Sequence, residues 1–305
     1  MMIDLPARGY RGRVYLGSFL RYRPLWLKYE GSKTLTDFQV GFILTNHDIA
    51  FEKLRPDKRD LLFITQDGEA IPYWMEKADS SEIIVWLKFS TIKKGKEIFW
   101  LYYGNGNFTG ASNGSSTFEF FDDFSANLDN WEQVGDGSAQ IVEDSDAYNG
   151  FSCKISPGTS GERTLWIPKI FEGDFAVELR LKGNQYIRVF MRGQDKTVKR
   201  NAVADFHSND TDHYNAIYDY IDDVSLANGG AGDIDWTIYH RESMRASGLN
   251  YYWYLDGSLY IQGTDSGGSQ PTSGYIGINS QGGDAFFDFV AVRKYVQVEP
   301  VIVLR

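Results

Sequence analysis

Short segments with side chains that alternate in polarity recur along this chain, and they constrain its fold more than any other feature. Examples are RVYLGSFL, FQVGFIL and EIIVWLKF, which are rich in β-branched and aromatic residues and bounded by Gly, Asp, Asn or Lys. Alternation at every second position places one face of a strand against a core and the other toward water. One segment, HDIAFEKLRPDKRD, has a helical pattern, and Pro56 limits it to a turn or two. The sequence therefore predicts an all-β protein.

The composition fits this interpretation and disfavours several classes of function. Aromatic residues make up 15% of the chain and only eight residues are proline, which is typical of strands rather than of disorder. The formal net charge of −10 would repel phosphate backbones and anionic lipid surfaces. We therefore expect no nucleic acid among the partners.

Membrane insertion and export signals are not expected either. No segment approaches the ~18 consecutive apolar residues of a membrane-spanning helix. The arginine-rich start, MMIDLPARGYRGRVYLGSFLRYRPLW, lacks the apolar core of a secretory signal. The single cysteine, Cys153, cannot form an internal disulfide, and we expect it to be a small buried side chain.

The length and the local composition predict two domains. A chain of 305 residues exceeds the ~100–200 residues of a usual domain. Residues 104–117 are rich in Gly, Ser and Asn and lack alternation, so we expect a linker over the surface there. We expect residues 1–25 to be an extension able to add a strand, residues 26–117 to form a β-sandwich that ends in this linker, and residues 118–305 to form a jelly roll.

The second domain reads as a series of short strands without a helical segment of useful length, which is typical of a two-sheet sandwich or jelly roll. Its clearest local feature is YWYLDGSLYI. Asp256 and Gly257 lie there between alternating aromatic residues and supply the positive φ angles of a tight hairpin.

Four blocks of the first domain carry a family resemblance. They are RYRPLWLKYEGSKTLTDFQVGFIL, LLFITQDGEAIPYWMEK, SEIIVWLKFSTIKKGKEIFWLYYGNGN and STFEFFDDF. In this order they resemble the successive blocks of the domain of unknown function 2341 family, over roughly residues 20 to 124. Members of that family usually carry a signal or a membrane anchor, and this chain departs from the family in showing neither.

The remainder, from FDDFSANLDNW to FFDFVAVRKYVQVEP, is similar to concanavalin A-like lectin/glucanase domains of the laminin G-like jelly-roll type. The resemblance implies a jelly-roll sandwich of the kind found in surface-exposed and glycan-binding proteins. It implies no catalytic activity, and the E-x-D-x-x-E pattern of the related glucanases is missing after Asp174 and Glu178.

Two adjacent carboxylates, Asp122 and Asp123, lie within the apolar stretch FEFFDDFSANLDNW and allow three interpretations. They can mark the junction between the domains, as turn residues. They can hold a structural calcium ion together with Asp288, because the first and last strands of a sandwich often pair. They can also act as a catalytic acid pair, which requires a second carboxylate across a cleft. The junction is the interpretation we favour.

Polar and aromatic side chains of the second domain are candidates for glycan binding. In QYIRVFMRG the side chains of Tyr186, Arg188 and Arg192 share one face of a strand. If the alternate residues Ile187, Val189 and Met191 are buried, this polar face is exposed. Sugars stack on aromatic planes beside planar hydrogen-bonding groups. The candidate ligand-binding residues are therefore Tyr186, Arg188, Arg192, Trp236, His240 and Trp253.

Together these features predict a non-enzymatic protein of the extracellular surface or of a virion. Its second domain would bind glycans or glycoproteins, and the whole would form a homo-oligomer or assemble into a particle. Two alternatives stay open. A glycoside-processing enzyme would need a pair of carboxyl groups in a cleft. A purely architectural particle or surface-layer protein would need large contacts between subunits but no pocket.

Overall fold

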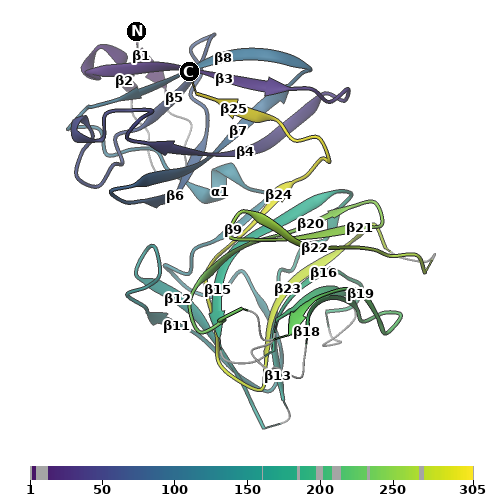
Figure 1. The fold of residues 1–305 in the computed structure, drawn as a ribbon. Coiled ribbons are helices and arrows are strands. Elements are labelled where there is room, and N and C mark those ends of the chain that lie inside the picture. Colours follow the sequence, from purple (N-terminus) through teal and green to yellow (C-terminus); the bar gives the residue numbers. More distant parts are fainter. Residues whose placement is uncertain are drawn as a thin grey trace. The chain divides into compact units, whose positions relative to one another are not determined.

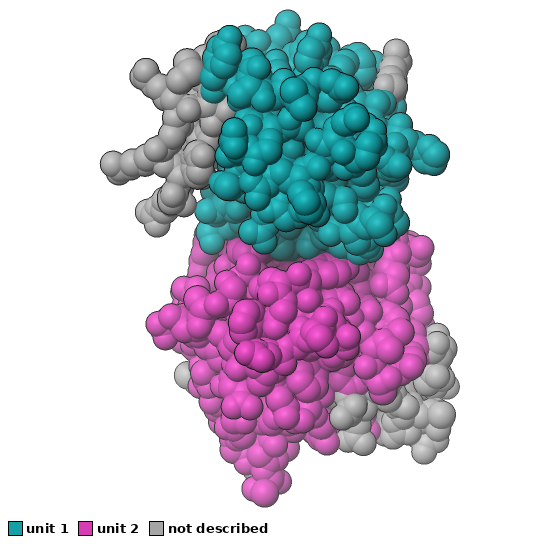
Figure 2. Space-filling model, turned by 90° about the vertical axis from the view of Figure 1, so that its left-hand side faces the viewer, with its two compact units in different colours: residues 1–119, 297–305 teal, residues 120–296 magenta. Residues whose placement is uncertain are grey.

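The computed structural model describes residues 2–4, 13–159, 161–183, 186–196, 202–207, 214–231, 234–267 and 271–304. The protein is all-β, as predicted, and divides into two compact units (Figure 2). The first unit comprises residues 1–119 and 297–305, and the second comprises residues 120–296. None of the helices within the described ranges has the length and apolar character needed to span a membrane.

In the part of the first unit that the structure describes there are two sheets and a separate strand pair (Figure 1). One sheet has the order β25-β3-β8-β5 and the other the order β4-β7-β6, while β1 pairs with β2. The bounds of these elements are β1 Met2–Asp4, β2 Arg13–Tyr15, η1 Leu16–Ser18, β3 Arg21–Tyr29, β4 Leu35–Thr45, η2 Phe51–Lys53, β5 Leu62–Thr65, β6 Tyr73–Ala78, β7 Glu82–Ile92, β8 Gly95–Tyr103, α1 Gly114–Thr117 and β25 Val301–Val303.

Aromatic pairs join the two sheets of the first unit. Phe89 on β7 meets Phe99 on β8 with ring centroids 5.4 Å apart, and Phe63 on β5 meets Tyr73 on β6 at 5.1 Å. Each pair is edge-to-face, the arrangement that the charge distribution of aromatic rings favours. The apolar sides of the two sheets therefore pack on one another as a sandwich.

The linker predicted at residues 104–117 is instead packed against the first unit. The buried carboxylate of Asp60 accepts hydrogen bonds from the N–H groups of Gly104 and Asn105, at 2.9 and 3.1 Å. Phe108 is buried, and α1 follows at the end of the segment. Glycine and serine enrichment predicted a free linker, but backbone hydrogen bonds and one aromatic side chain hold this segment in place.

The predicted N-terminal extension, residues 1–25, contains more regular structure than one added strand. Strands β1 and β2 pair with each other, and residues 5–12 between them lie outside the described ranges. Strand β3 begins within the same segment, at Arg21, and pairs with β8 along its whole length. The last part of the extension therefore belongs to a sheet of the first unit.

Within the described residues, the second unit is a sandwich of two antiparallel sheets with eight strands each. Sheet I has the order β10-β13-β23-β16-β17-β18-β19, with β14 on β23, and sheet II has the order β11-β12-β24-β15-β20-β21-β22, with β9 on β24. The strands of sheet I are β10 Glu132–Gly135, β13 Glu162–Trp166, β14 Phe171–Glu172, β16 Ile187–Gly193, β17 Val203–His207, β18 Tyr214–Asp219, β19 Val224–Ala231 and β23 Ser273–Gln281. Those of sheet II are β9 Phe120–Asp122, β11 Gly137–Glu143, β12 Phe151–Pro157, β15 Phe175–Gly183, β20 His240–Ser247, β21 Asn250–Leu255, β22 Ser258–Thr264 and β24 Ala285–Lys294.

One continuous apolar core lies between sheets I and II. Sheet I contributes Ile187, Val189 and Met191, and sheet II contributes Val177 and Leu179, all of them fully buried or nearly so. Full burial of an aliphatic side chain stabilises the fold by ~1.5–3 kcal/mol relative to exposure. The core therefore fixes which face of each strand points inward.

The tight hairpin predicted at Asp256 and Gly257 is confirmed. These residues connect β21 to β22 with φ angles of 46° and 83°, and Leu255 pairs with Ser258. Positive φ at both central residues gives a turn whose twist matches that of the flanking strands.

The predicted C-terminal boundary of the second domain is wrong, because the last residues return to the first unit. Strand β25 pairs with β3, with Ile302 opposite Leu27 (Figure 1). The second unit thus ends at Val296 rather than at Arg305. A short three-residue strand after a proline gave little alternation from which this pairing could be predicted.

Residues 120–296 should unfold on their own in one cooperative transition, because their core is self-contained. Deleting residues 297–305 from the full chain should lower the melting temperature of the first unit, since β3 loses its edge partner. A loss of ~1 kcal/mol corresponds to about 4–8 °C in a domain of 60–100 residues and to about 2–4 °C in one of 150–250 residues, and the first unit lies between these sizes. Calorimetry of the three proteins checks both statements, and a deletion that shifted only the transition of residues 120–296 would contradict the assignment.

Candidate functional site

The outer face of sheet I, the face turned away from sheet II, carries a buried polar cluster around Arg188. Because Ile187 and Val189 fill the core, Arg188 between them points to the other side, as the alternation predicts. Its Nε donates to the hydroxyl of Tyr220 at 2.8 Å, and its Nη1 donates to Oδ1 of Asn279 at 2.9 Å.

The same guanidinium group also donates from Nη2 to Gln281, and Asn279 in turn donates to the hydroxyl of Thr164 at 2.8 Å. We call Arg188, Tyr220, Asn279, Gln281 and Thr164 the outer polar cluster. Its acceptors are neutral side-chain oxygens held at fixed positions on strands β13 and β23 and just after β18. Arg188 itself is only 2% exposed, so this cluster is a rigid base rather than a freely accessible ligand surface.

Aromatic rings lie beside the polar cluster on the same face. Trp166 stacks on Phe190 with centroids 5.3 Å apart, and Tyr275 packs against this pair. The Trp166 ring lies directly over Gly193 and Gly277, where an added Cβ would come within 2.8 and 2.6 Å of it. Glycine at both positions therefore makes room for a large flat side chain on the sheet.

A groove of about 420 Å³ opens at the edge of this aromatic group. We call it the outer-face groove, and it is lined by Glu132, Gln133, Val134, Gln194, Asp195, Lys196 and Tyr275. The Nζ of Lys196 lies 4.9 Å from the centroid of the half-buried Tyr275 ring. The same Nζ forms an ion pair with Oε2 of Glu132 at 2.5 Å. The amide of Gln194 donates to the carbonyls of Arg192 and Ser273, which fixes the orientation of its own oxygen.

Of the predicted ligand-binding residues, Tyr186 and Arg188 lie near this face and Arg192 does not. Tyr186 is half-buried, and its carbonyl accepts the N–H of Gln281 at 3.0 Å. Arg192 is wholly buried and donates to the carbonyl of Gly248 at 2.6 Å and to the hydroxyl of Tyr251, a core residue, at 3.1 Å. The expected alternation fails because the register shifts between Phe190 and Gly193, and Arg192 takes a φ of 57°.

Trp236 and Trp253 are core residues, so the expectation that they face a ligand is also wrong. Their rings are stacked 6.0 Å apart and are 1% and 0% exposed. The ring of His207 lies 4.4 Å from Trp236 and 4.7 Å from Trp253, and its Nε2 meets Oε1 of Glu242 at 2.7 Å. His240 packs against Trp236 at the edge of this group. Sequence patterns gave no indication of this buried His207–Glu242 pair, because its members are 35 residues apart along the chain.

The three carboxylates predicted to bind calcium are not among those in the described residues whose oxygens lie within 4.8 Å of one another. Strand β9 does pair with β24, but each carboxylate has protein donors of its own. Asp122 accepts from Nε1 of Trp131 at 2.8 Å, Asp123 from the serine two residues later at 2.7 Å, and Asp288 from Arg180 at 2.6 Å. Burial raises the pKa of both Asp122 and Asp288. Asp122 therefore fixes the turn that opens the second unit, which agrees with the junction interpretation.

The first unit has a larger groove of about 850 Å³. Its lining includes one indole ring and many polar side chains, among them Trp26, Gln66, Asp67, Glu69, Lys88, Thr91 and Lys96. Lys96 Nζ lies 4.8 Å from the centroid of Trp26 and covers the ring. This groove is a second concave surface on which a polar ligand can be tested.

The fold and the site define a class: an all-β protein whose second unit is a sandwich of the jelly-roll kind. The family described as "Domain of unknown function (DUF2341)" matches residues 57–134. The match overlaps the later part of the segment, roughly residues 20 to 124, over which the sequence resembles this family. A comparison with curated proteins gave no match.

Three solved structures are similar to parts of this chain. The carbohydrate-binding module CBM66 from Bacillus subtilis is 18% identical, with 54% of this chain and 96% of that chain covered and a TM-score of 0.42. A protein of unknown function with a galectin-like fold from Bacillus subtilis is 13% identical, with 62% and 97% covered and a TM-score of 0.46. The carbohydrate esterase vb_24B_21 from the Shiga toxin-encoding bacteriophage phi24B is 14% identical, with 55% and 92% covered and a TM-score of 0.38.

Replacing Arg188 by Ala should destabilise the second unit rather than leave its stability unchanged. The change removes the donor for Tyr220, Asn279 and Gln281, and each buried polar group left unsatisfied costs roughly 1–3 kcal/mol. Urea denaturation of the Arg188→Ala protein checks this, with the exposed Arg21→Ala as the control. An unchanged midpoint for Arg188→Ala would show that its side chain is not buried.

The stability that His240 gains from Asp256 should depend on pH. His240 Nδ1 lies 2.8 Å from Asp256, and this hydrogen bond, opposed by partial burial, raises the pKa of His240. Burial acts to raise the pKa of Asp256, but the His240 hydrogen bond and the nearby charges lower it overall. A histidine pKa that is raised on folding stabilises the folded state fully below about pH 6.5. An aspartate pKa that is lowered on folding stabilises it fully above about pH 3.9, so the pair contributes most to stability between these two pH values.

The Asp256→Asn change should therefore lower the melting temperature more at pH 5.5 than at pH 8.5. Asparagine tolerates the positive φ of 46° at this position, so the turn itself is preserved. Thermal melts of the native and Asp256→Asn proteins at both pH values measure the difference. The same comparison made in a His240→Gln background should show no such dependence on pH, and a dependence that persisted would assign it to other groups.

Proposed function

We propose that this protein is a non-enzymatic glycan-binding protein and that its second unit binds a glycan in the outer-face groove. The observation that carries the proposal is the half-buried ring of Tyr275 among side-chain amides and carboxylates in a groove of about 420 Å³. Sugars present apolar C–H faces and hydroxyl groups together, and they are bound by aromatic rings flanked by planar hydrogen-bonding groups.

The rigid face behind the groove supports this use. Val134 and Tyr275 line the groove and also pack against the buried rings of Trp166 and Phe190. The outer polar cluster ties strands β13, β16 and β23 together next to these rings. A binding surface that is ordered before the ligand arrives loses less conformational entropy on binding.

The polar side chains of the groove fit hydroxyl recognition. Gln194 presents an oriented amide oxygen, and the carboxylate of Glu132, paired with Lys196, accepts hydrogen bonds. Asp195 adds a second exposed carboxylate. Neutral polyols gain specificity from such fixed donors and acceptors, whereas a polyanion would be opposed by a net charge of −10.

We extend the proposal to the place of action, since the ligand class fits an extracellular surface or a virion, where glycans of other cells are met. Assembly into a homo-oligomer or a particle would raise the avidity of a single weak site. The alternative of a glycoside-processing enzyme would require two carboxyl groups that face one sugar and a measurable release of product.

Binding should be measured with the full chain on an array of bacterial, plant and animal glycans. We expect a defined set of ligands, and for these the Tyr275→Ala protein should bind at least about tenfold more weakly, a loss of ~1.4 kcal/mol in binding free energy. The matched control is Tyr15→Ala, because Tyr15 is 57% exposed and lies in the first unit. The control should bind like the native protein.

Other outcomes of the same experiment would contradict the proposal in distinct ways. Binding lost in a Trp26→Ala protein but retained in Tyr275→Ala would assign the ligand to the groove of the first unit. Release of reducing sugar from a bound glycan would assign enzymatic activity. A clean absence of binding would favour the architectural alternative.

A further inference from the structure

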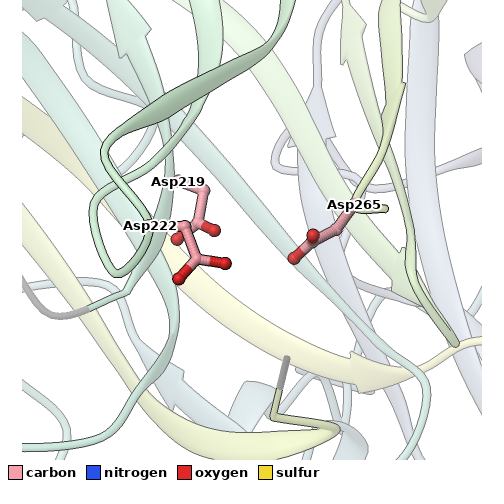
Figure 3. Close-up of side chains that lie close together, drawn as sticks. All are labelled: Asp219, Asp222 and Asp265. Carbon is pink, nitrogen blue, oxygen red and sulfur yellow. The ribbon is translucent and has the colours of Figure 1, made fainter. Parts of the chain in front are cut away.

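Three carboxylates from distant parts of the sequence converge at one edge of the second unit. Asp219, Asp222 and Asp265 each offer an oxygen, and these oxygens lie within 4.8 Å of one another (Figure 3). Asp219 ends β18 of sheet I, and Asp222 lies in the turn that leads to β19. Asp265 directly follows β22 of sheet II. The cluster therefore joins the two sheets.

Two of these carboxylates are removed from water. Asp219 is 0% exposed and Asp265 is 1% exposed, while Asp222 is exposed. Like charges this close destabilise the folded chain unless a cation or protons compensate them.

The hydrogen bonds of Asp265 point independently to a ligand. Its Oδ1 accepts the N–H of Gly267 at 2.9 Å. Its Oδ2 is buried and has no hydrogen-bond partner within the described ranges. Figure 3 shows the carboxylate directed toward Asp219 and Asp222. A buried carboxylate oxygen without a donor is costly and rare in native proteins, and a bound cation would satisfy it.

A glycine keeps space open beside the cluster. A Cβ at Gly267 would lie 2.6 Å from Oδ2 of Asp222 and 3.3 Å from Oδ1 of Asp265. Any side chain at this position would press on both carboxylates. The exposed Asp222 provides the side from which an ion can enter.

We propose that Asp219, Asp222 and Asp265 bind a calcium ion that links the β18–β19 turn of sheet I to the end of β22 in sheet II. Calcium takes ~6–8 oxygen ligands at ~2.3–2.6 Å, so oxygens on opposite sides of the ion are ~4.6–5.2 Å apart. The observed limit of 4.8 Å fits this spacing. Water and backbone carbonyls complete the shell, and an all-oxygen set disfavours zinc, which prefers nitrogen and sulfur.

The site is distinct from the calcium site predicted from the sequence, whose three carboxylates are engaged by protein donors. Its role is structural, because the ion compensates the charge of two buried carboxylates. The proposal does not depend on glycan binding.

The test uses the full chain, stripped of metal with a chelator and desalted. Calcium chloride alone should raise the melting temperature of the second unit by several degrees and give a saturable heat in titration calorimetry. Magnesium at the same concentration should give a smaller shift, since it demands a tighter octahedral shell. No shift and no heat with calcium in the native protein would overturn the proposal.

Two variants separate metal binding from folding. Asp265→Asn should abolish the calcium shift while melting at or above the metal-free native protein, because it removes charge repulsion. Asp223→Asn is the matched control: this neighbouring turn residue has a φ of 56°, which asparagine tolerates, and it should retain the full shift. An equal calcium shift in Asp265→Asn, or its loss in Asp223→Asn, would contradict the assignment.

Discussion

Burial of the aliphatic side chains of β16 between sheets I and II is the constraint on which the second unit depends. With Ile187, Val189 and Met191 in the core, Arg188 has to lie on the outer face. A guanidinium group buried there is tolerated because Tyr220, Asn279 and Gln281 present oxygens to it at fixed positions. The same alternation that builds the core thus also places the outer polar cluster on the opposite face of sheet I.

The polar residues inside the core then fix how the two sheets face each other. The Nδ1–H of His207 donates to the carbonyl of Ile187 on the neighbouring strand, so Nε2 meets the carboxylate of Glu242 across the sandwich. The hydrogen bond between Nε2 and the carboxylate needs a second proton, which is carried either by the His207 ring or by Glu242. A buried pair of this kind contributes little net stability, but it penalises any register that separates its members. Trp236 and Trp253 enclose the pair, which is why these indoles are unavailable to a ligand.

Alternation and turn chemistry predicted the all-β fold, most strands and the Asp256–Gly257 hairpin, because these depend on neighbouring residues. Strand β19 was not predicted, since its sequence VSLANGGA is rich in residues that disfavour strands and pairing with β18 overrides that preference. Arg188 was predicted on the correct face but not as a buried residue, and a bulge that no pattern indicated turned Arg192 inward. The carboxylates of Asp219 and Asp265 are separated by four strands, β19 to β22, so their convergence depends on how sheet I meets sheet II.

Tyr220 connects the aspartate cluster to the outer polar cluster. It lies between Asp219 and Asp222 in the chain, and its hydroxyl accepts from Arg188 while its ring meets the edge of Phe190 at 6.0 Å. A cation that fixes the carboxylates on both sides of Tyr220 would also restrict this ring, and hence the Arg188 guanidinium group that donates to its hydroxyl. Thermodynamic linkage makes such a coupling reciprocal. If a bound ion increases the affinity of the groove for its ligand, the bound ligand increases the affinity for the ion by the same factor. The turn between β18 and β19 would therefore connect the proposed ion site to the outer polar cluster, although neither proposal requires the other.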